Sequence, residues 1–476
     1  MNPRPNILIV VIDSLRRDHV SCYGYERKTT PNIDRLAEEG CLFETCITAA
    51  PFSPASYASI FSGLYPHQHG VNGDTVRVWP DTWPRLAERL KGSGYSTFLA
   101  TANPFVGQAT HAHLGFDHLL ETYQRPWLMH KYAGAVRRAR RCFGDRIADV
   151  LEPHHVRWPE MRSSSRIARW IGEQARRAAP PFFGVAILMD PHAPYDTRRR
   201  EFCGSGPAVR RFFRRVNSGD TFTRLMAHSA ALSPSELQIA IDLYDAEIRH
   251  ADHCVGLVRD ILHRESSLDE TLLIVTADHG EAFGEHGVWG HGFCLNDCLT
   301  RVPLVVRHPR LFPAGTRSRA LVQLPDLYDT CLALAGEAVA QSWNGLSLTQ
   351  AADPAWEGRE YAFSEFPVQT GTLSLMKNFN PDFEPGPWGK QMWSVRTRKW
   401  RYIEYDDGGH ELYDLASDPQ EQFSLHEERP DILEKLQEVL AEHRGRSRAG
   451  AAPGVRHSET VDPVVLDRLR ALGYIE

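Results

Sequence analysis

Short apolar runs alternate with segments of helical spacing along the first third of the chain. Residues 6–12, 42–48 and 97–100 are apolar runs with the length of buried strands. Residues 32–36 and 83–90 carry apolar positions at helical spacing and end close to glycines. Because strands and helices alternate, we expect an α/β fold with a doubly wound, mostly parallel sheet.

The same pattern continues through the middle of the chain. Residues 182–188 and 272–275 are further apolar runs that read as buried strands. The polar, Arg-rich residues 121–177 predict a helical insertion near the functional site. Ser233 and Glu236 have the spacing of a capping box around Pro234, so a long helix is expected before the strand at 272–275.

The pattern changes in the last third of the chain. Short alternating runs at residues 393–397, 400–405 and 410–415 are separated by turn-forming residues, which is typical of β-hairpins. We therefore expect a catalytic α/β domain over residues 1–345 and a C-terminal α+β subdomain over residues 346–476. The subdomain should contain a small antiparallel sheet and a helical tail.

Composition is that of an ordinary globular protein. The 476 residues are 42% hydrophobic and 24% charged, and the net charge of −6 gives no reason to expect nucleic acid as a partner. No segment has the length of a membrane span. The nine cysteines form no CxxC pair, which favours a reducing, cytoplasmic location over a disulfide framework. The sequence does not decide whether the chain forms a homo-oligomer.

Chemically competent side chains follow several of the predicted strands. Asp278 and His279 come directly after the run at 272–275, and Asp13 follows the first strand. Asp190 and His192 follow the strand at 182–188. Since open α/β sheets bind ligands at the carboxyl ends of their strands, a metal site is expected there, with carboxylate and imidazole ligands. The plainer alternatives are a helix cap for Asp13 and a simple turn for the Asp-His-Gly segment.

A serine-rich segment follows the predicted strand at 42–48. Residues 50–63 contain Ser53, Ser56, Ser59 and Ser62 among small residues, and they look like a loop that enters a helix. Any of these hydroxyls could be a helix cap, but the segment also suits the close approach of one serine to an anion at a helix N-terminus. His67 and His69 are expected to brace helix packing.

Short motifs in a fixed order carry a family resemblance. They lie at residues 6–13, 23–24, 30–34, 53–63, 65–71, 192–195, 278–281, 291, 301–304 and 411–415. Together they resemble the sulfatases of the alkaline phosphatase superfamily. The resemblance implies a large α/β domain that carries the site and a small C-terminal domain with a four-stranded antiparallel sheet. It also implies a metal-dependent hydrolase.

The chain departs from the usual sulfatase pattern at the nucleophile. Sulfatases carry a Cys or Ser that is oxidised to formylglycine, followed two positions later by Pro or Ala and four positions later by Arg. Those positions here are Ser53, Ala55 and Tyr57. Without the Arg, we expect Ser53 to stay unmodified, as in phosphoethanolamine transferases and lipoteichoic acid synthases. His279 and His291 also stand where sulfatases usually have Asn and Lys.

The expected roles follow from the residues and the resemblance. Asp13, Asp278, His279 and Ser53 should hold a divalent cation, with Mn²⁺ or Zn²⁺ favoured over Ca²⁺. Ser53 is the expected nucleophile, with Ser56 as its rival. The remaining candidates are His192 and His291 for acid catalysis and substrate binding, Asn103 for substrate binding, and Asp190 with His192 and His291 for a second metal site.

The expected activity is hydrolysis of a small anionic ester. The first hypothesis is a sulfate ester hydrolase that forms a covalent seryl intermediate. The alternatives on the same site are a phosphodiesterase, a phosphonate monoesterase and a phosphotransferase. A non-catalytic binding protein that keeps the sulfatase fold is the alternative of another class.

Overall fold

The computed structural model describes most of the chain. The described residues are 4–71, 78–122, 163–337 and 346–445, without residues 81, 194, 196–200, 205, 207–208, 210–211, 213–223 and 229. The expected domain boundary at residue 345 adjoins positions outside these ranges, so it stays a prediction. Most of the expected insertion at 121–177 also lies outside them, as does the C-terminal tail.

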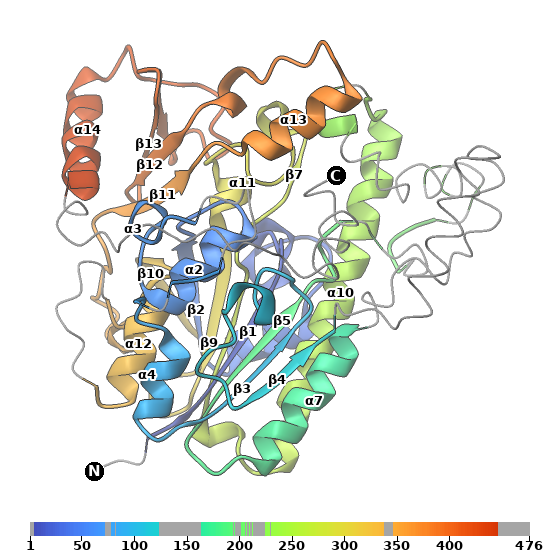
Figure 1. The fold of residues 1–476 in the computed structure, drawn as a ribbon, viewed down its shortest axis with the longest axis vertical. Coiled ribbons are helices and arrows are strands. Elements are labelled where there is room, and N and C mark those ends of the chain that lie inside the picture. Colours follow the sequence, from blue (N-terminus) through green and yellow to red (C-terminus); the bar gives the residue numbers. More distant parts are fainter. Residues whose placement is uncertain are drawn as a thin grey trace.

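A mixed eight-stranded sheet forms the centre of the molecule (Figure 1). Its strand order is β10 (Thr316–Gln323), β2 (Cys41–Ile47), β9 (Arg301–Arg307), β6 (Thr271–Thr276), β1 (Asn6–Ile12), β5 (Phe182–Leu188), β3 (Ser96–Thr101) and β4 (His118–Glu121). All neighbours pair in parallel except β9, which runs antiparallel to both β2 and β6. The predicted α/β class with a mostly parallel sheet is confirmed.

The central strands end at the same edge of the sheet. Every residue of β1, β5 and β6 is buried, as expected of parallel strands covered on both faces. Near their carboxyl ends, Val11 pairs with Thr276 and Ile12 pairs with Leu188. This register brings the segments that begin at Asp13, Met189 and Ala277 to one place.

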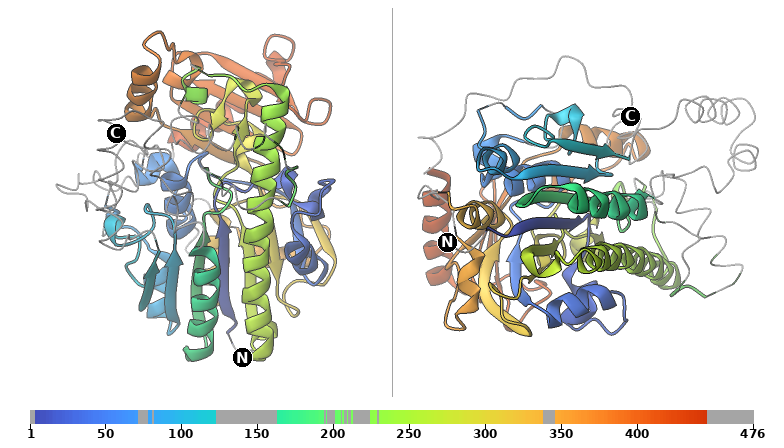
Figure 2. Two further views of the ribbon diagram at one scale, coloured as in Figure 1. Left: turned by 90° about the vertical axis from the view of Figure 1, so that its right-hand side faces the viewer. Right: turned by 90° about the horizontal axis from the view of Figure 1, so that it is seen from below.

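Two groups of helices flank the sheet. One group contains α1 (Pro31–Glu38), α7 (Ser163–Arg177) and α10 (Pro234–Arg264), and the other contains α2 (Ser53–Ser62), α4 (Leu86–Gly92) and α12 (Asp326–Leu334). Figure 2 shows α7 and α10 side by side along the sheet. A Cβ atom on Gly172 of α7 would lie 2.5 Å from the Ile261 side chain of α10. Glycine at this position therefore permits the close approach of the two helices.

The long helix before β6 begins as its sequence predicts. The Ser233 hydroxyl accepts a hydrogen bond from the Glu236 backbone nitrogen, and Glu236 Oε2 accepts one from the Ser233 backbone nitrogen at 2.9 Å.

The structure corrects one expectation for the segment that was predicted to be an insertion. Residues 163–177 are helical, as expected, but they belong to the packed core and not to an insertion, because α7 buries Ile167, Ile171 and Ala175 against the fold.

A second sheet follows in the C-terminal part. Its strands are β11 (Ala362–Phe366), β12 (Met392–Arg396), β13 (Trp400–Tyr405) and β14 (His410–Asp414), all antiparallel. Helix α14 (Pro430–Gly445) packs on β12 and β13, and α13 (Thr370–Phe379) connects β11 with β12. Among the described residues, no helix has both the length and the apolar character needed to cross a bilayer. The eight cysteines in the described ranges form no disulfide bond with one another.

Candidate active site

The carboxyl edge of the large sheet gathers Asp13, Ser53, Asp278 and His279. The Ser53 hydroxyl donates a hydrogen bond to Asp278 Oδ2 at 2.7 Å. Its oxygen also lies 3.2 Å from Asp13 Oδ2 and 3.2 Å from His279 Nε2. All of these side chains are completely buried. Segments from β1, α2 and the end of β6 therefore meet at one point around a serine hydroxyl.

The backbone conformation on both sides of the site positions Asp278 beside Ser53 and Asp13. A Cβ atom on Gly280 would lie 1.9 Å from the Cys298 carbonyl oxygen, so only glycine fits here. The Gly280 amide donates to the Leu299 carbonyl at 2.8 Å and fixes the turn. Ser14 has a left-handed φ of 59°, which lets its backbone nitrogen donate to Asp278 Oδ1 at 3.2 Å.

Asp13 and Asp278 place two carboxylates next to each other without exposure to water. Burial and the charge of Asp13 raise the pKa of Asp278 well above its ordinary value. Burial also opposes ionisation of Asp13, but the imidazoles of His192, His279 and His291 lower its pKa. A divalent cation would offset the repulsion between the carboxylates. Asp13, Asp278 and His279 have ligand atoms within 4.8 Å of one another, so this donor set fits such an ion.

Two further histidines face the same place. The His291 ring lies 4.4 Å from the His279 ring and 5.1 Å from the His192 ring, measured between centroids. His192 Nδ1 donates to the Ala193 carbonyl at 2.6 Å, which turns its Nε2 away from the backbone. Burial and the neighbouring imidazoles of His279 and His192 lower the pKa of His291 well below its ordinary value. The predicted histidines are therefore brought together with the serine and the carboxylates.

Asn103 and Ser56 lie in the site with different partners. Asn103 Nδ2 donates to Asp13 Oδ2 at 2.7 Å, so this amide orients a carboxylate, and its expected contact with substrate stays a prediction. The Ser56 hydroxyl donates to the Asp278 backbone carbonyl at 2.8 Å and lies 2.9 Å from the Thr48 hydroxyl. This engagement with backbone favours Ser53 over Ser56 as the nucleophile.

Asp190 points to another set of residues. Its Oδ1 accepts from His250 Nδ1 of α10 at 2.8 Å, and its Oδ2 accepts from the Ser164 hydroxyl of α7. Among the described side chains, Asp190 does not gather with His192 and His291 as a metal-ligand group. The second cation site therefore stays a prediction, and the hydrogen bonds of Asp190 tie the end of β5 to two helices.

Glu281 is a buried site residue to which the sequence analysis gave no role. Its Oε1 lies 3.3 Å from His291 Nδ1, and burial raises its pKa to about 7. The only signal in the sequence was its position two residues after His279. Its placement beside His291 depends on the short hairpin of β7 (Ala282–Phe283) and β8 (Trp289–Gly290), which turns the chain back toward Glu281.

Comparison with known proteins decides the family. The model of the family described as Sulfatase matches residues 5–337. The chain belongs to the sulfatase family. It is 24% identical to the N-acetylglucosamine-6-O-sulfatase of Bacteroides thetaiotaomicron, over 93% of this chain and 87% of that protein. It is 25% identical to the choline-sulfatase of Rhizobium meliloti, over 99% of this chain and 92% of that protein.

The fold is shared with a hydrolase of another ester class. The structure of this sulfatase-family chain superposes on the phosphonate monoester hydrolase of Agrobacterium radiobacter with a TM-score of 0.64 and 20% identity. The match covers 93% of this chain and 96% of that chain. At this identity the likeness establishes the fold. The fold and the enzyme class expected from the motifs are confirmed by these comparisons.

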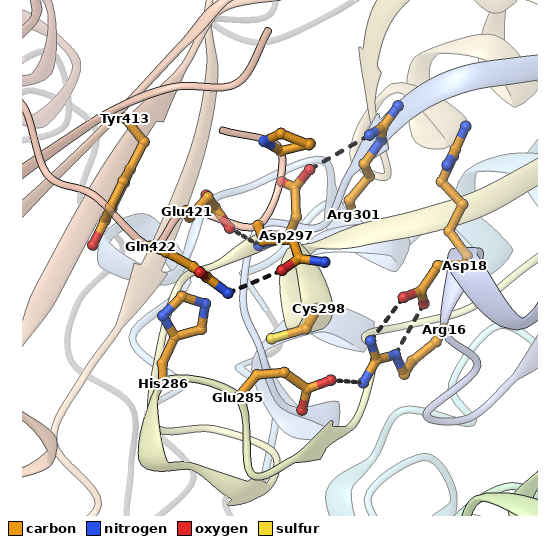
Figure 3. Close-up of a pocket in the computed structure, with 13 residues that line it drawn as sticks. Arg16, Asp18, Glu285, His286, Asp297, Cys298, Arg301, Tyr413, Glu421 and Gln422 are labelled. Atoms are coloured by element: carbon orange, nitrogen blue, oxygen red, sulfur yellow. Dashed lines mark hydrogen bonds and ion pairs between the residues drawn. The ribbon is translucent and has the colours of Figure 1, made fainter. Parts of the chain in front are cut away.

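A separate pocket of about 520 Å³ lies between the large sheet and the C-terminal sheet of this sulfatase-family protein (Figure 3). Its charged side chains are largely paired with one another. Arg16 binds Asp18 at 2.7 Å and Glu285 at 2.6 Å, and Asp297 pairs with Arg401. Arg16 also donates to the Glu281 backbone carbonyl at 3.0 Å. Among the residues that line it, none is a predicted site residue.

Proposed function

We propose that this protein is a metal-dependent hydrolase of small sulfate esters, with unmodified Ser53 as its nucleophile. The observation that carries the proposal is the contact of the Ser53 hydroxyl with Asp13, Asp278 and His279 in a fully buried site. A buried hydroxyl that touches two carboxylates and an imidazole is unusual unless the group has a chemical role. Membership of the sulfatase family and the sulfatase names of its relatives support a sulfate ester as the substrate.

Asp13, Asp278, His279 and Ser53 would hold the cation. When bound, a divalent ion there lowers the pKa of the Ser53 hydroxyl and offsets negative charge on the ester, with Mn²⁺ or Zn²⁺ suited to the mixed ligands. Ser53 lies at the first turn of α2, where backbone amides and the helix dipole favour an anion close to its oxygen. Asn103 keeps Asp13 oriented toward Ser53 through its 2.7 Å hydrogen bond.

The reaction follows from the positions of these side chains. Ser53 Oγ attacks the sulfur, so that an oxygen–sulfur bond forms and the bond from sulfur to the leaving oxygen breaks. The serine proton passes to Asp278 Oδ2, to which the hydroxyl donates. His192 gives a proton to the leaving oxygen as the alcohol departs, while His291, whose lowered pKa favours the neutral imidazole, contacts the ester. Water then attacks the sulfur of the seryl sulfate, His192 takes a proton from this water, and Asp278 returns its proton to Ser53 Oγ as sulfate leaves.

The lack of formylglycine has a kinetic consequence. A formylglycine adduct releases sulfate by elimination, whereas a seryl sulfate requires a second displacement at sulfur. We therefore expect slower release of the second product, or transfer of the group to an acceptor other than water. Tyr57 stands at the position where sulfatases usually have Arg, and the missing Arg supports an unmodified Ser53.

A phosphate diester is the second candidate substrate. The side chains that hydrogen-bond to Ser53, Asp13 and Asp278 in the described ranges bring no positive charge other than imidazole. A site with so few cations favours a monoanion, either a sulfate monoester or a phosphate diester, over a phosphate monoester that carries nearly two charges. The shared fold of the phosphonate monoester hydrolase supports this candidate.

Parallel assays with matched aryl esters test the proposal. The wild-type protein and Ser53→Ala are incubated with an aryl sulfate, a bis-aryl phosphate and an aryl phosphate monoester in the presence of Mn²⁺ or Zn²⁺. We expect turnover of the sulfate that requires Ser53. Preference for the diester would support the second candidate, and no turnover of any ester would favour a binding protein. The cytoplasmic location stays a prediction from the number and spacing of the cysteines in the sequence.

A further inference from the structure

A second group of metal-ligand side chains lies apart from the candidate active site. It consists of His67 of α3 (Pro66–His69), Glu365 of β11 and His443 of α14, which we call the clip residues. Their ligand atoms lie within 4.8 Å of one another. Figure 1 shows the three elements together where the C-terminal sheet adjoins the large domain. The clip residues therefore join three segments that are far apart in the sequence.

The ligand atoms converge on one carboxylate oxygen. Glu365 Oε1 contacts His67 Nδ1, and His443 Nε2 lies 3.5 Å from the same oxygen. Glu365 Oε2 accepts a hydrogen bond from the His67 backbone nitrogen at 2.8 Å, which fixes the rotation of the carboxylate. The side chains of Glu365 and His443 are only 3% and 8% exposed, and that of His67 is 15% exposed.

Aromatic packing holds His443 in this orientation. Its ring stacks on Phe363 with a centroid distance of 3.7 Å and an interplanar angle of 3°. The Tyr65 ring meets it edge-on at 4.6 Å. These apolar walls exclude water, so the charge of Glu365 needs a positive partner. Burial opposes ionisation of Glu365, but the contacts with His443 and His67 lower its pKa to about 2.

We propose that His67 Nδ1, Glu365 Oε1 and His443 Nε2 bind one structural Zn²⁺ ion. Two imidazoles and one carboxylate are a donor set that suits Zn²⁺. Zn²⁺ supplies the positive charge that the buried carboxylate needs. The alternative without metal is a hydrogen-bonded cluster of an imidazolium, a carboxylate and an imidazole.

The position of the clip gives it a structural purpose. Helix α3 follows α2 after a short turn, and Ser53 is the first residue of α2. A metal that joins residue 67 to residue 443 would fasten the C-terminal helix to the segment that carries the nucleophile. Closing so long a loop stabilises the folded state. The clip shares no ligand with the candidate active site, so substitutions can separate the two sites.

Metal content of the full-length protein tests the clip. The protein is stripped with chelator, equilibrated with Zn²⁺, desalted and analysed by mass spectrometry for zinc. We expect two zinc ions per chain in the wild type and one each in His443→Asn and Asp278→Asn. His443→Asn should keep most of its activity with aryl sulfate but lose part of the rise in melting temperature that Zn²⁺ produces. His426→Asn, a more exposed histidine in the same C-terminal part, should behave as the wild type.

Two outcomes would overturn the clip. One is equal zinc content in His443→Asn and the wild type. The other concerns the melting temperature. If His443→Asn lowers it by the same amount with and without Zn²⁺, the residues form a hydrogen-bonded cluster and not a metal site. If His443→Asn does not fold, Co²⁺ absorption of Asp278→Asn decides the question, since this variant keeps only the clip. If Asp278→Asn shows no visible absorption band from Co²⁺ bound to imidazole ligands, the proposal is contradicted, whatever the activity results.

Discussion

The Ser53 hydroxyl lies 2.7 Å from Asp278 Oδ2, although 225 residues separate the two in the chain. Asp278 stands at the end of β6, in the centre of the sheet, and Ser53 begins the helix that follows β2. The β9 strand lies between β2 and β6, so the contact spans the antiparallel part of the sheet. This contact defines the candidate active site.

Removal of the Ser53 hydroxyl should abolish turnover. We expect Ser53→Ala to lower kcat/KM for an aryl sulfate by at least about 10³-fold, because no other hydroxyl replaces the nucleophile. Ser56→Ala is the matched control on the same helix. It should lower the free energy of unfolding by about 1–3 kcal/mol, since it leaves buried polar groups unsatisfied, while activity falls far less. The reverse order of activities would assign the nucleophile to Ser56.

Chelation should inactivate the enzyme reversibly. Activity should return with Mn²⁺ or Zn²⁺ and return less with Ca²⁺, as measured by initial rates after metal titration. In Asp278→Asn, the metal-free protein should be at least as stable as the metal-free wild type, because one of two facing buried carboxylates is gone. The same variant should not recover activity with any of the ions. Full activity in chelator would contradict a metal-dependent site.

Asn103 should act through Asp13. We expect Asn103→Ala to weaken metal binding at the active site by about 10–100-fold, because the hydrogen bond that orients Asp13 is lost. At saturating metal, KM for the ester should change little. Metal titrations followed by activity separate these quantities. A raised KM with unchanged metal affinity would instead support the original expectation that Asn103 contacts substrate.

Glu281 should position His291. Glu281→Gln keeps the volume of the side chain but replaces the carboxylate near His291 Nδ1, so we expect kcat to fall by about 10-fold with KM unchanged. Glu285→Gln is the control in the adjacent loop, where Glu285 binds Arg16 outside the site. Equal effects of the two substitutions on kcat would show a general disturbance of the loop and would remove the assigned role of Glu281.

The sequence was sufficient to predict the strand ends and their polar residues. Apolar runs with polar residues directly after them identified β1, β5 and β6, and the parallel register explains why Asp13 and Asp278 meet. The order of the sulfatase-like motifs predicted that Ser53 joins these two aspartates. The spacing of Ser233 and Glu236 was enough to predict the start of α10, because capping is local.

Contacts that depend on tertiary packing were not predictable. Asp190 follows β5 as expected, but its partners come from α7 and α10. The sequence around residue 190 does not indicate that these two helices pack beside it. β11 was not anticipated, because its partner β12 and the nearby Ala49 carbonyl supply the pairing that its own short sequence does not indicate. The clip residues come from three distant segments, so only the folded chain brings them together.

Peptide mass spectrometry across Ser53 shows whether this residue is modified and whether it carries the covalent intermediate. Before substrate is added, the account predicts the mass of unmodified serine. After rapid quenching with an aryl sulfate, it predicts a gain of about 80 Da on Ser53, the mass of a transferred sulfuryl group. A loss of about two daltons at Ser53 before substrate, which marks formylglycine, would contradict the account. Turnover without any label on Ser53 would contradict it as well.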